Sequence, residues 1–194
     1  MKTAILAIKP NSSLVSGLIP LKIFKWCFLA FTTPLASIFT EILNTAEIPG
    51  FLKIASVIPL YKGKGTTTNP DNYRPISLLS PMAKIFEVVL FNKLRPLIES
   101  RLCPQQHGFR RNRSTHTAIS VFSQEVWDSL DQTNGRVGAV YIDLRKAFNS
   151  VQSEILLHKL AFRFNLPVQL VKVIRSFLSS RTFNIRIGNF ISKS

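Results

Sequence analysis

The sequence predicts an α+β fold, and three observations lead to that prediction. Apolar residues recur at helical spacing in several segments, for example 34–46 and 82–98. Other short segments are rich in β-type apolar residues and end at turn-forming residues, for example 54–61 and 181–187. Helices and strands do not alternate with the regularity that parallel βαβ units require, which favours α+β over α/β.

The first expected elements are helical. Residues 23–39 are apolar and aromatic, but they contain Lys25 and Pro34 and fall short of the length that a membrane span needs. We therefore expect a buried helix there rather than a span. The helical spacing continues over 34–46 and should end before Pro49.

A β-hairpin is expected next. Residues 54–61 form a β-type apolar run, and residues 62–71 are polar and contain glycine, as a hairpin loop does. Residues 72–79 then return as the second strand.

Two longer helices should follow the hairpin. Ser80 before Pro81 is typical of a helix start, with a capping hydroxyl and a proline at the first helical position. Pro96 near the far end should kink or end this helix. Ser114 or Thr115 can cap the second helix.

The rest of the chain is predicted to contain two strands and two helices. After a turn over 131–136, residues 137–143 are largely apolar, which predicts a strand buried on both faces. Ser153 should cap a helix through Leu160, and Pro167 should start another that reaches about Leu178. Residues 181–187 alternate between apolar and polar side chains, which predicts a strand with one buried face.

Composition narrows the classes of function. The chain has 25 Lys and Arg against 10 Asp and Glu, a net charge of +15, and it is 46% hydrophobic. The hydrophobic content excludes a disordered tail. A globular chain this basic usually binds a polyanion, and nucleic acid is favoured here over a membrane surface. Cys27 and Cys103 form neither a zinc motif nor a disulfide framework, which favours a reducing intracellular compartment. The first ten residues are too short for a secretory signal.

Asp143 is the first candidate for chemistry, because it ends the expected strand 137–143 and polar residues follow at once. A carboxylate at the edge of a sheet can bind a hard cation such as Mg²⁺. It can equally cap a turn that begins at Leu144. A site for phosphoryl transfer on two metal ions needs further carboxylates. The chain offers few of them, in loop-like or helix-end positions: Asp71, Asp128 and Asp131.

The expected hairpin carries the second candidate, the basic residues Lys62, Lys64 and Arg74. Several cationic donors on a mobile hairpin suit a triphosphate. The segment is not a P-loop, because no Gly-Lys-Ser/Thr follows the glycines and no helix opens there. A plain solvated loop is the alternative interpretation.

The third candidate is a cluster of arginines beside an aromatic residue: Phe109, Arg110, Arg111 and Arg113. Arginines suit backbone phosphates, and the ring of Phe109 or of His107 could pack or stack on a base. His107 and His116 are too far apart for a helical metal pair and lack acidic partners, so neither is interpreted as a ligand.

Six motifs occur in an order that is characteristic of one family. They are Asn-Tyr-Arg-Pro-Ile-Ser-Leu at 72–78, Lys-Ile-Phe-Glu at 84–87, Gln-His-Gly-Phe-Arg at 106–110 with Arg-Ser-Thr at 113–115, the run from Asp143 to Phe148, Leu-Leu-His-Lys-Leu at 156–160 and Phe-Leu-Ser-Ser-Arg at 177–181. Each is weak alone, but the ordered set is specific. Over about residues 34–190 the chain resembles the reverse transcriptase domain of non-LTR (LINE-type) retrotransposons, of the jockey-like and chicken-repeat-like kind. Ser12, Ser13 and residues 17–20 weakly resemble the upstream part of that domain.

The resemblance implies a fold and a set of partners. The family's fold is a right hand of fingers, palm and thumb, of which we expect fingers and a partial palm here, with the thumb absent. Residues 1–33 would be a degraded helical upstream segment, 34–136 the fingers-like region and 137–194 the partial palm. The implied partners are an RNA template, a DNA primer and deoxynucleoside triphosphates, with no membrane and no defined protein partner, and the implied location is cytoplasm and nucleus.

The resemblance also implies residue roles. Asp143 matches the first catalytic aspartate and Mg²⁺ ligand, with the Leu144 backbone carbonyl assisting, and Phe148 matches the ring that excludes a 2′-hydroxyl by its volume. Lys62 or Lys64, together with Arg74, would meet the phosphates of the incoming nucleotide. Residues 105–116 would lie near template and nucleotide, with nucleic-acid contacts from the arginine cluster: Phe109, Arg110, Arg111 and Arg113.

Two departures from the family pattern bear on activity. Asn149 stands where the family usually has an aspartate that is not a metal ligand, so we expect this departure to have a modest effect on activity. The sequence has no Asp-Asp pair, and the family's Gly-x-Pro-Gln-Gly-like block is expected just past Ser194, so we expect the chain alone to be inactive. The alternatives are a non-catalytic nucleic-acid-binding remnant and, less favoured, a basic membrane-associated protein that uses residues 14–39. Group II intron maturases and telomerase fit less well than LINE elements.

Overall fold

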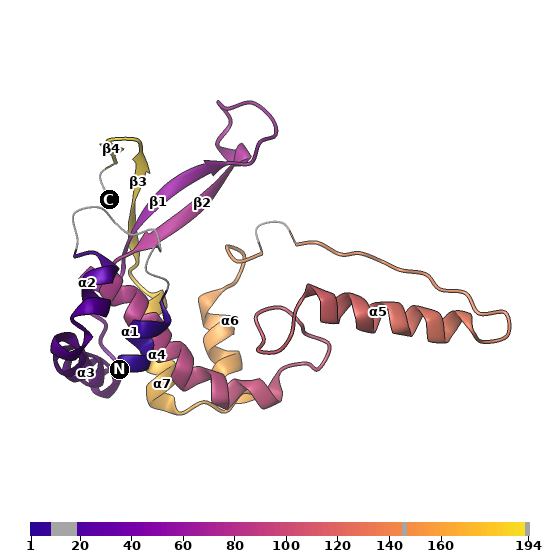
Figure 1. Ribbon diagram of the computed structural model, residues 1–194, viewed down its shortest axis with the longest axis horizontal. Helices are drawn as coiled ribbons and strands as arrows, with labels where there is room; N and C mark the ends of the chain where they lie inside the picture. Colours follow the sequence, from indigo (N-terminus) through magenta and orange to yellow (C-terminus); the bar gives the residue numbers. More distant parts are fainter. Residues whose placement is uncertain (9–18, 145–146, 193–194) are drawn as a thin grey trace. The chain divides into compact units, whose positions relative to one another are not determined.

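The computed structural model describes residues 1–8, 19–144 and 147–192 (Figure 1). The chain divides into two compact units, unit 1 with Met1–Leu94 and Ser153–Ser194, and unit 2 with Arg95–Gln152. Helices and a small sheet are both present, so the predicted mixture of α and β structure is confirmed. Ser12, Ser13, Gly17, Leu18, Arg145 and Lys146, which belong to motifs singled out in the sequence, lie outside the described residues.

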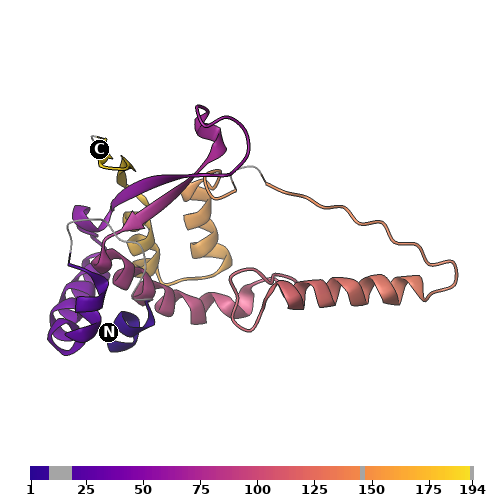
Figure 2. The same ribbon diagram turned by 45° about the horizontal axis from the view of Figure 1, so that its top comes forward.

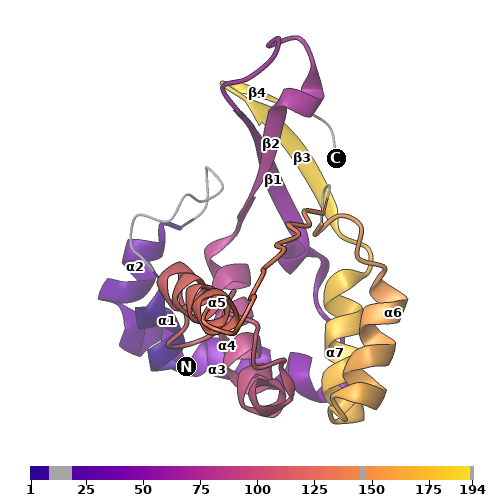
Figure 3. The same ribbon diagram turned by 90° about the vertical axis from the view of Figure 1, so that its right-hand side faces the viewer.

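Unit 1 holds the sheet and most of the helices. Its helices are α1 (Lys2–Ala7), α2 (Leu21–Trp26), α3 (Phe28–Thr45), most of α4 (Pro81–Ile98), α6 (Ser153–His158) and α7 (Val168–Leu178). Its strands are β1 (Ile54–Tyr61), β2 (Tyr73–Leu79), β3 (Thr182–Ile187) and β4 (Phe190–Ile191). Short 3₁₀ turns cover Gly50–Leu52 and Pro70–Asn72, and a π-helical turn, Lys159–Arg163, continues α6. Figure 3 shows α6 and α7 side by side.

The sheet has the strand order β2-β1-β3-β4. β1 and β2 form the predicted antiparallel hairpin, in register from Ala55 opposite Leu79 to Tyr61 opposite Tyr73. β3 joins the other edge of β1 in parallel, although more than a hundred residues separate them in sequence, and β4 folds back antiparallel on β3. The loop of the hairpin lies at its far end from α3 and α4 (Figures 1 and 3).

The core of unit 1 lies where α3, α4 and α7 meet. Phe39 of α3 is 1% exposed and Phe86 of α4 is fully buried, and their rings pack edge to face with centroids 5.1 Å apart. Phe177 of α7 approaches the other side of Phe86, with centroids 6.4 Å apart. A ring contact of this kind adds to the apolar area that each side chain buries.

Two polar contacts fasten α7 to the end of α3. The Gln169 side-chain amide donates to the backbone carbonyls of Leu43 and Asn44, at 3.0 and 2.6 Å. The Ser176 hydroxyl accepts from the backbone N–H of Ile48 at 3.1 Å. These bonds satisfy groups at and just beyond the end of α3, which a helix cannot satisfy by itself.

The predicted starts of the two helices that follow the hairpin are confirmed, whereas Ser153, predicted as a cap, is the first residue of α6. The Ser80 hydroxyl accepts from the Ala83 N–H at 3.1 Å at the start of α4. Ser114 caps α5 (Thr115–Leu130) with its hydroxyl on the Thr117 N–H, and the Thr117 hydroxyl completes the capping box. Pro96 lies two residues before the end of α4, and a 3₁₀ turn, Glu99–Arg101, follows.

The predicted strand over residues 137–143 is wrong. These residues leave the turn after α5 as an extended segment (Figure 2), and no described strand pairs with them. Val140 and Tyr141 are 87% and 85% exposed. A strand needs a neighbour to satisfy its backbone N–H and C=O groups, and the four described strands pair only with one another.

The predicted burial of one face of β3 is also wrong. The apolar side chains Phe183, Ile185 and Ile187 are 57%, 41% and 63% exposed, whereas the intervening Asn184 and Arg186 are half-buried. The alternation does place the apolar side chains on one face, as predicted, but among the described residues no element covers that face along β3.

Residues 23–39, predicted as one buried helix, form parts of two helices, namely most of α2 and the first two thirds of α3. One face of α3 is buried, with Leu35, Phe39 and Ile42 in the core, while Leu29 is 78% exposed. Of the helices that the structure describes, none combines the length and the hydropathy needed to cross a membrane.

Glu87 of α4 gives unit 1 a testable pH dependence. Burial raises the pKa of its carboxyl above the ordinary value of 4.5, and the charges of Arg181 and Lys84 offset this in part. The folded state therefore holds the proton more tightly than the unfolded chain. The stability from this group is fully present below about pH 4.5 and is lost as the pH rises through the raised pKa.

We therefore expect Glu87→Gln to stabilise the protein at pH 7, and this gain to shrink as the pH falls toward 4.5. Urea unfolding at several pH values measures the difference between the two proteins. Glu41→Gln, at an exposed site of the same unit, controls for the loss of one negative charge. A difference that stays constant with pH would contradict the expectation.

Candidate nucleotide and nucleic-acid interface

The hairpin loop between β1 and β2 is held in one shape by its own polar groups. The backbone N–H of Lys62 donates to the Asn72 carbonyl at 2.8 Å, and the Asn72 side-chain amide donates to the Thr66 carbonyl at 2.8 Å. The Tyr73 hydroxyl donates to the Thr67 carbonyl at 2.9 Å. A loop tied across itself in this way loses less entropy on binding than a flexible one.

One glycine is required by this packing. Gly65 has φ +82°, and a Cβ there would lie 2.4 Å from the Asn72 side-chain nitrogen. The Tyr61 hydroxyl also bonds to the Gly65 carbonyl, and the rings of Tyr61 and Tyr73 lie 5.4 Å apart beneath the loop. Any larger residue at this position would have to displace the Asn72 amide.

The three basic residues of the hairpin differ in what they can do. The Lys62 ammonium donates to the Asp71 carbonyl at 2.5 Å, so it helps to hold the loop. Lys64 and Arg74 are exposed. Arg74 lies opposite Leu60 in the register, whereas the tyrosine pair is one residue further along and therefore on the other face of the hairpin. The hairpin thus presents Lys64 and Arg74 from a fixed frame.

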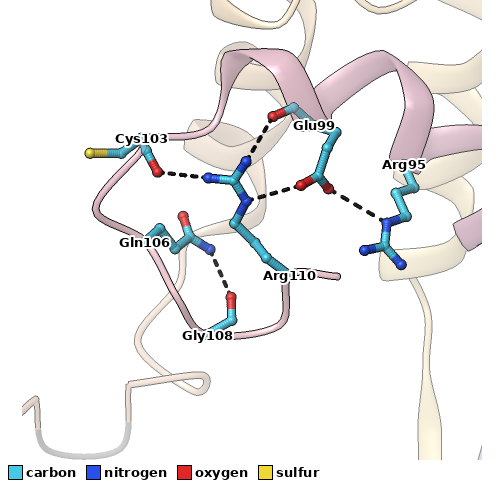
Figure 4. Close-up of polar contacts among 6 residues, drawn as sticks. All are labelled: Arg95, Glu99, Cys103, Gln106, Gly108 and Arg110. Carbon is cyan, nitrogen blue, oxygen red and sulfur yellow. Dashed lines mark hydrogen bonds and ion pairs between the residues drawn. The ribbon is translucent and has the colours of Figure 1, made fainter. Parts of the chain in front are cut away.

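Arg110 belongs to the arginine cluster of unit 2, and its guanidinium points toward Glu99 and Cys103 (Figure 4). Its Nε donates to Glu99 Oε1 at 3.0 Å, one terminal nitrogen donates to the Cys103 carbonyl at 2.9 Å, and the other to the Glu99 carbonyl at 3.4 Å. Its side chain is only 13% exposed. The predicted role of Arg110 in nucleic-acid contact is not tested by these bonds, but each of its three guanidinium nitrogens already donates to an acceptor within the loop.

The neighbours of Arg110 are presented outward. Arg111 and Arg113 are exposed, and the Phe109 ring is 91% exposed on a backbone with φ +60°. The structure also brings Phe109 and Phe148 together, with ring centroids 6.2 Å apart and planes at 85°. The two rings were predicted to have separate roles, and no pattern in the sequence indicated that they would meet.

A hollow of about 320 Å³ lies beside this cluster at the start of α5. It is lined by His107, Gly108, Phe109, Arg113, Ser114, Thr115 and Ala118. His107 is held by a 2.8 Å bond between its Nδ1 and the Thr117 hydroxyl, which fixes the orientation of its ring at the start of α5. The hollow combines an aromatic ring with a cation, which are the groups that bases and phosphates contact.

Asp143 lies on the exposed segment after α5 and not at the edge of a sheet. The alternative, a cap on a turn that begins at Leu144, involves residues 145 and 146, which lie outside the described residues. Across the part of the chain that the structure describes, no three or more His, Cys, Asp or Glu side chains gather closely enough to bind a metal ion. Asp143 is a suitable oxygen ligand for Mg²⁺, but one carboxylate is not the donor set of a two-metal site.

Residues 62–193 match the family described as reverse transcriptase (RNA-dependent DNA polymerase). The chain is 32% identical over 160 residues to the probable RNA-directed DNA polymerase from transposon BS of Drosophila melanogaster, and 33% identical over 160 residues to that from mobile element jockey of the same species. Both alignments cover 81% of this chain but 17% of the relative. A putative 115 kDa protein in the type-1 retrotransposable element R1DM of D. melanogaster is 29% identical over 165 residues, 84% of this chain and 16% of the relative. The chain thus spans about a sixth of the length of these relatives.

Proposed function

The chain belongs to the reverse transcriptase (RNA-dependent DNA polymerase) family, with homologues among retrotransposon polymerases, and on this premise we propose that it supplies the surfaces of such a polymerase that hold the incoming nucleotide and the template. In this proposal residues 34–136 are the fingers-like region and residues 137–194 part of the palm. The partners are an RNA template, a DNA primer and deoxynucleoside triphosphates, in cytoplasm and nucleus.

The observation that carries the proposal is the preorganised hairpin. Its loop is tied by backbone and side-chain bonds, and it presents Lys64 and Arg74 to solvent. A triphosphate carries several negative charges, and cations held in place by a rigid loop bind it with little loss of entropy. We assign the phosphate contacts to Lys64 and Arg74, and to Lys62 the role of supporting the loop.

In unit 2 we assign the template contacts to Arg111 and Arg113, with Phe109 available to stack on a base. Arginines that contact backbone phosphates give affinity without sequence preference, and an exposed ring accepts any base. Binding of single-stranded RNA should therefore be independent of sequence and should weaken as salt is added.

Asp143 is proposed as one ligand of the catalytic Mg²⁺, with the Leu144 carbonyl beside it. The ion would neutralise charge on the phosphates when bound. Phe148 is proposed as the ring that rejects a ribose 2′-hydroxyl by its volume. Its contact with Phe109 supports the ring from one side and leaves 81% of it exposed.

The template assignment is tested by salt-dependent binding of a labelled single-stranded RNA. We expect Arg111→Gln with Arg113→Gln to weaken binding and to lower the slope of log K against log salt by about two, since each phosphate contact contributes about one. Arg163→Gln with Lys172→Gln removes two exposed charges from unit 1 and is the matched control. Equal losses from both pairs would mean that bulk charge, and not a nucleic-acid path, explains the binding.

A further inference from the structure

Arg110 closes a loop that joins two helices. The loop runs from the 3₁₀ turn after α4 to the cap of α5, and the Arg110 guanidinium bonds to the side chain and carbonyl of Glu99 and to the carbonyl of Cys103 (Figure 4). Glu99 Oε2 also forms an ion pair with the Nε of Arg95, at 3.5 Å, so the carboxylate lies between two arginines. Inside the loop, the Gln106 side-chain amide donates to the Gly108 carbonyl at 3.2 Å.

The chemistry of this contact requires an arginine. A guanidinium is a planar fork that can serve a carboxylate and two carbonyls at once, whereas a lysine ammonium is a point charge on a flexible stem. Bonds between charged groups are also stronger than neutral ones. A phosphate that approached this guanidinium would compete with bonds that the loop already makes, and the side chain is only 13% exposed.

The backbone is in the left-handed region at two positions around Arg110. Phe109 has φ +60°, which is strained for a residue with a bulky side chain, and Asn112 has φ +58°, which asparagine adopts more readily. Such conformations persist where surrounding contacts hold them. The side chain of Arg110 is anchored between these two positions, so its bonds fix the turn that places Phe109 in solvent.

We infer that Arg110 is a positioning residue, which together with Glu99 clamps residues 102–113 in the conformation that presents Phe109, Arg111 and Arg113 to nucleic acid. The effect on RNA rests on the proposed function, whereas the effect on the loop does not. Neutralising Glu99 is therefore expected to make the chain more positive and yet to weaken its binding of RNA.

The first experiment measures binding of a labelled single-stranded RNA to the full chain over a range of salt. We expect Glu99→Gln and Arg110→Lys each to weaken binding about tenfold, the factor that corresponds to about 1.4 kcal/mol. The slope of log K against log salt should stay unchanged, because neither side chain touches a phosphate. Glu125→Gln, at an exposed site on α5, adds the same charge as Glu99→Gln and should bind slightly more tightly.

The second experiment measures amide hydrogen exchange in residues 102–113 without RNA. Loss of the clamp should speed exchange there about tenfold in Glu99→Gln and Arg110→Lys, and not in Glu125→Gln. Because exchange is measured without RNA, it tests whether Arg110 and Glu99 hold the loop independently of whether the loop binds RNA. If no protein binds RNA, the proposed function fails, and the exchange rates alone decide the clamp.

Two results would overturn the inference. One is a Glu99→Gln protein that binds as tightly as Glu125→Gln and shows unchanged exchange in the loop. The other is evidence that residue 110 contacts a phosphate. In that case Arg110→Lys would bind RNA with full affinity, and Arg110→Gln would lower the slope of log K against log salt by about one. Arg110→Lys keeps the charge and decides the question even if Glu99→Gln fails to fold.

Discussion

Phe86→Ala is expected to lower the free energy of unfolding of unit 1 by about 3–5 kcal/mol, the usual cost of removing a buried aromatic ring. Phe86 is fully buried, and its ring packs against those of Phe39 and Phe177. The cavity would open where α3, α4 and α7 meet, and rings on both sides would lose contacts. Because a small domain is stable by only about 5–15 kcal/mol, this loss would be a large fraction of the free energy of unfolding of unit 1.

Urea unfolding followed by circular dichroism measures this loss. α5 in unit 2 contributes to the helical signal separately, so the transition of unit 1 should be followed by hydrogen exchange in α3 and α4 as well. Phe162→Ala, at a ring that is 75% exposed, is the matched control and should cost under about 1 kcal/mol. Similar losses from both variants would show that the ring cluster is not the centre of the core.

The hairpin and the helix starts could be predicted because they depend on neighbouring residues. Ser80 and Pro81 determine the start of α4, and Ser114 caps α5 through a residue three positions away. The loop of the hairpin likewise follows from its polar, glycine-bearing sequence. Signals of this kind act within a few residues, so a sequence shows them directly.

The predictions that were wrong depend on which segments pair or pack together, and such segments can be distant from each other in sequence. An apolar run such as 137–143 shows that a segment would benefit from burial, but not which strand would pair with it. The alternation in β3 shows that Phe183 and Ile185 share a face, but not whether anything covers that face. The parallel pairing of β3 with β1 is a third example, because no local pattern records it.

In the candidate site, too, some features could be predicted from the sequence and others could not. The sequence identified the basic residues of the hairpin and of the arginine cluster, since charge is visible in composition. It did not distinguish a cation that binds a ligand from a cation that holds a loop. Lys62 and Arg110 are the two cations that the structure shows bonded within their own loops, Lys62 to the backbone carbonyl of Asp71 and Arg110 to the carboxylate of Glu99.

The largest effect on activity is expected from Asp143→Asn. The experiment uses a jockey-type polymerase in which residues 62–193 of this chain replace the matching segment. Loss of a carboxylate that binds the metal should reduce DNA synthesis more than about a hundredfold, since even groups that only orient a metal ligand contribute about ten- to a hundredfold. Affinity for the template should not fall, because the negative charge of Asp143 repels phosphates when no metal is bound.

Asp131→Asn is the matched control for Asp143→Asn. Asp131 is an exposed aspartate of the same unit, at the end of α5, and its replacement removes the same charge. Primer extension at saturating template separates a defect in synthesis from a defect in binding. If the two variants extend primers at equal rates, Asp143 is not a metal ligand, and the match between its motif and the family's catalytic aspartate is one of sequence alone. If only Asp143→Asn loses synthesis while template affinity is kept, the exposed segment that carries Asp143 here must be brought to the reacting phosphates in the complete polymerase.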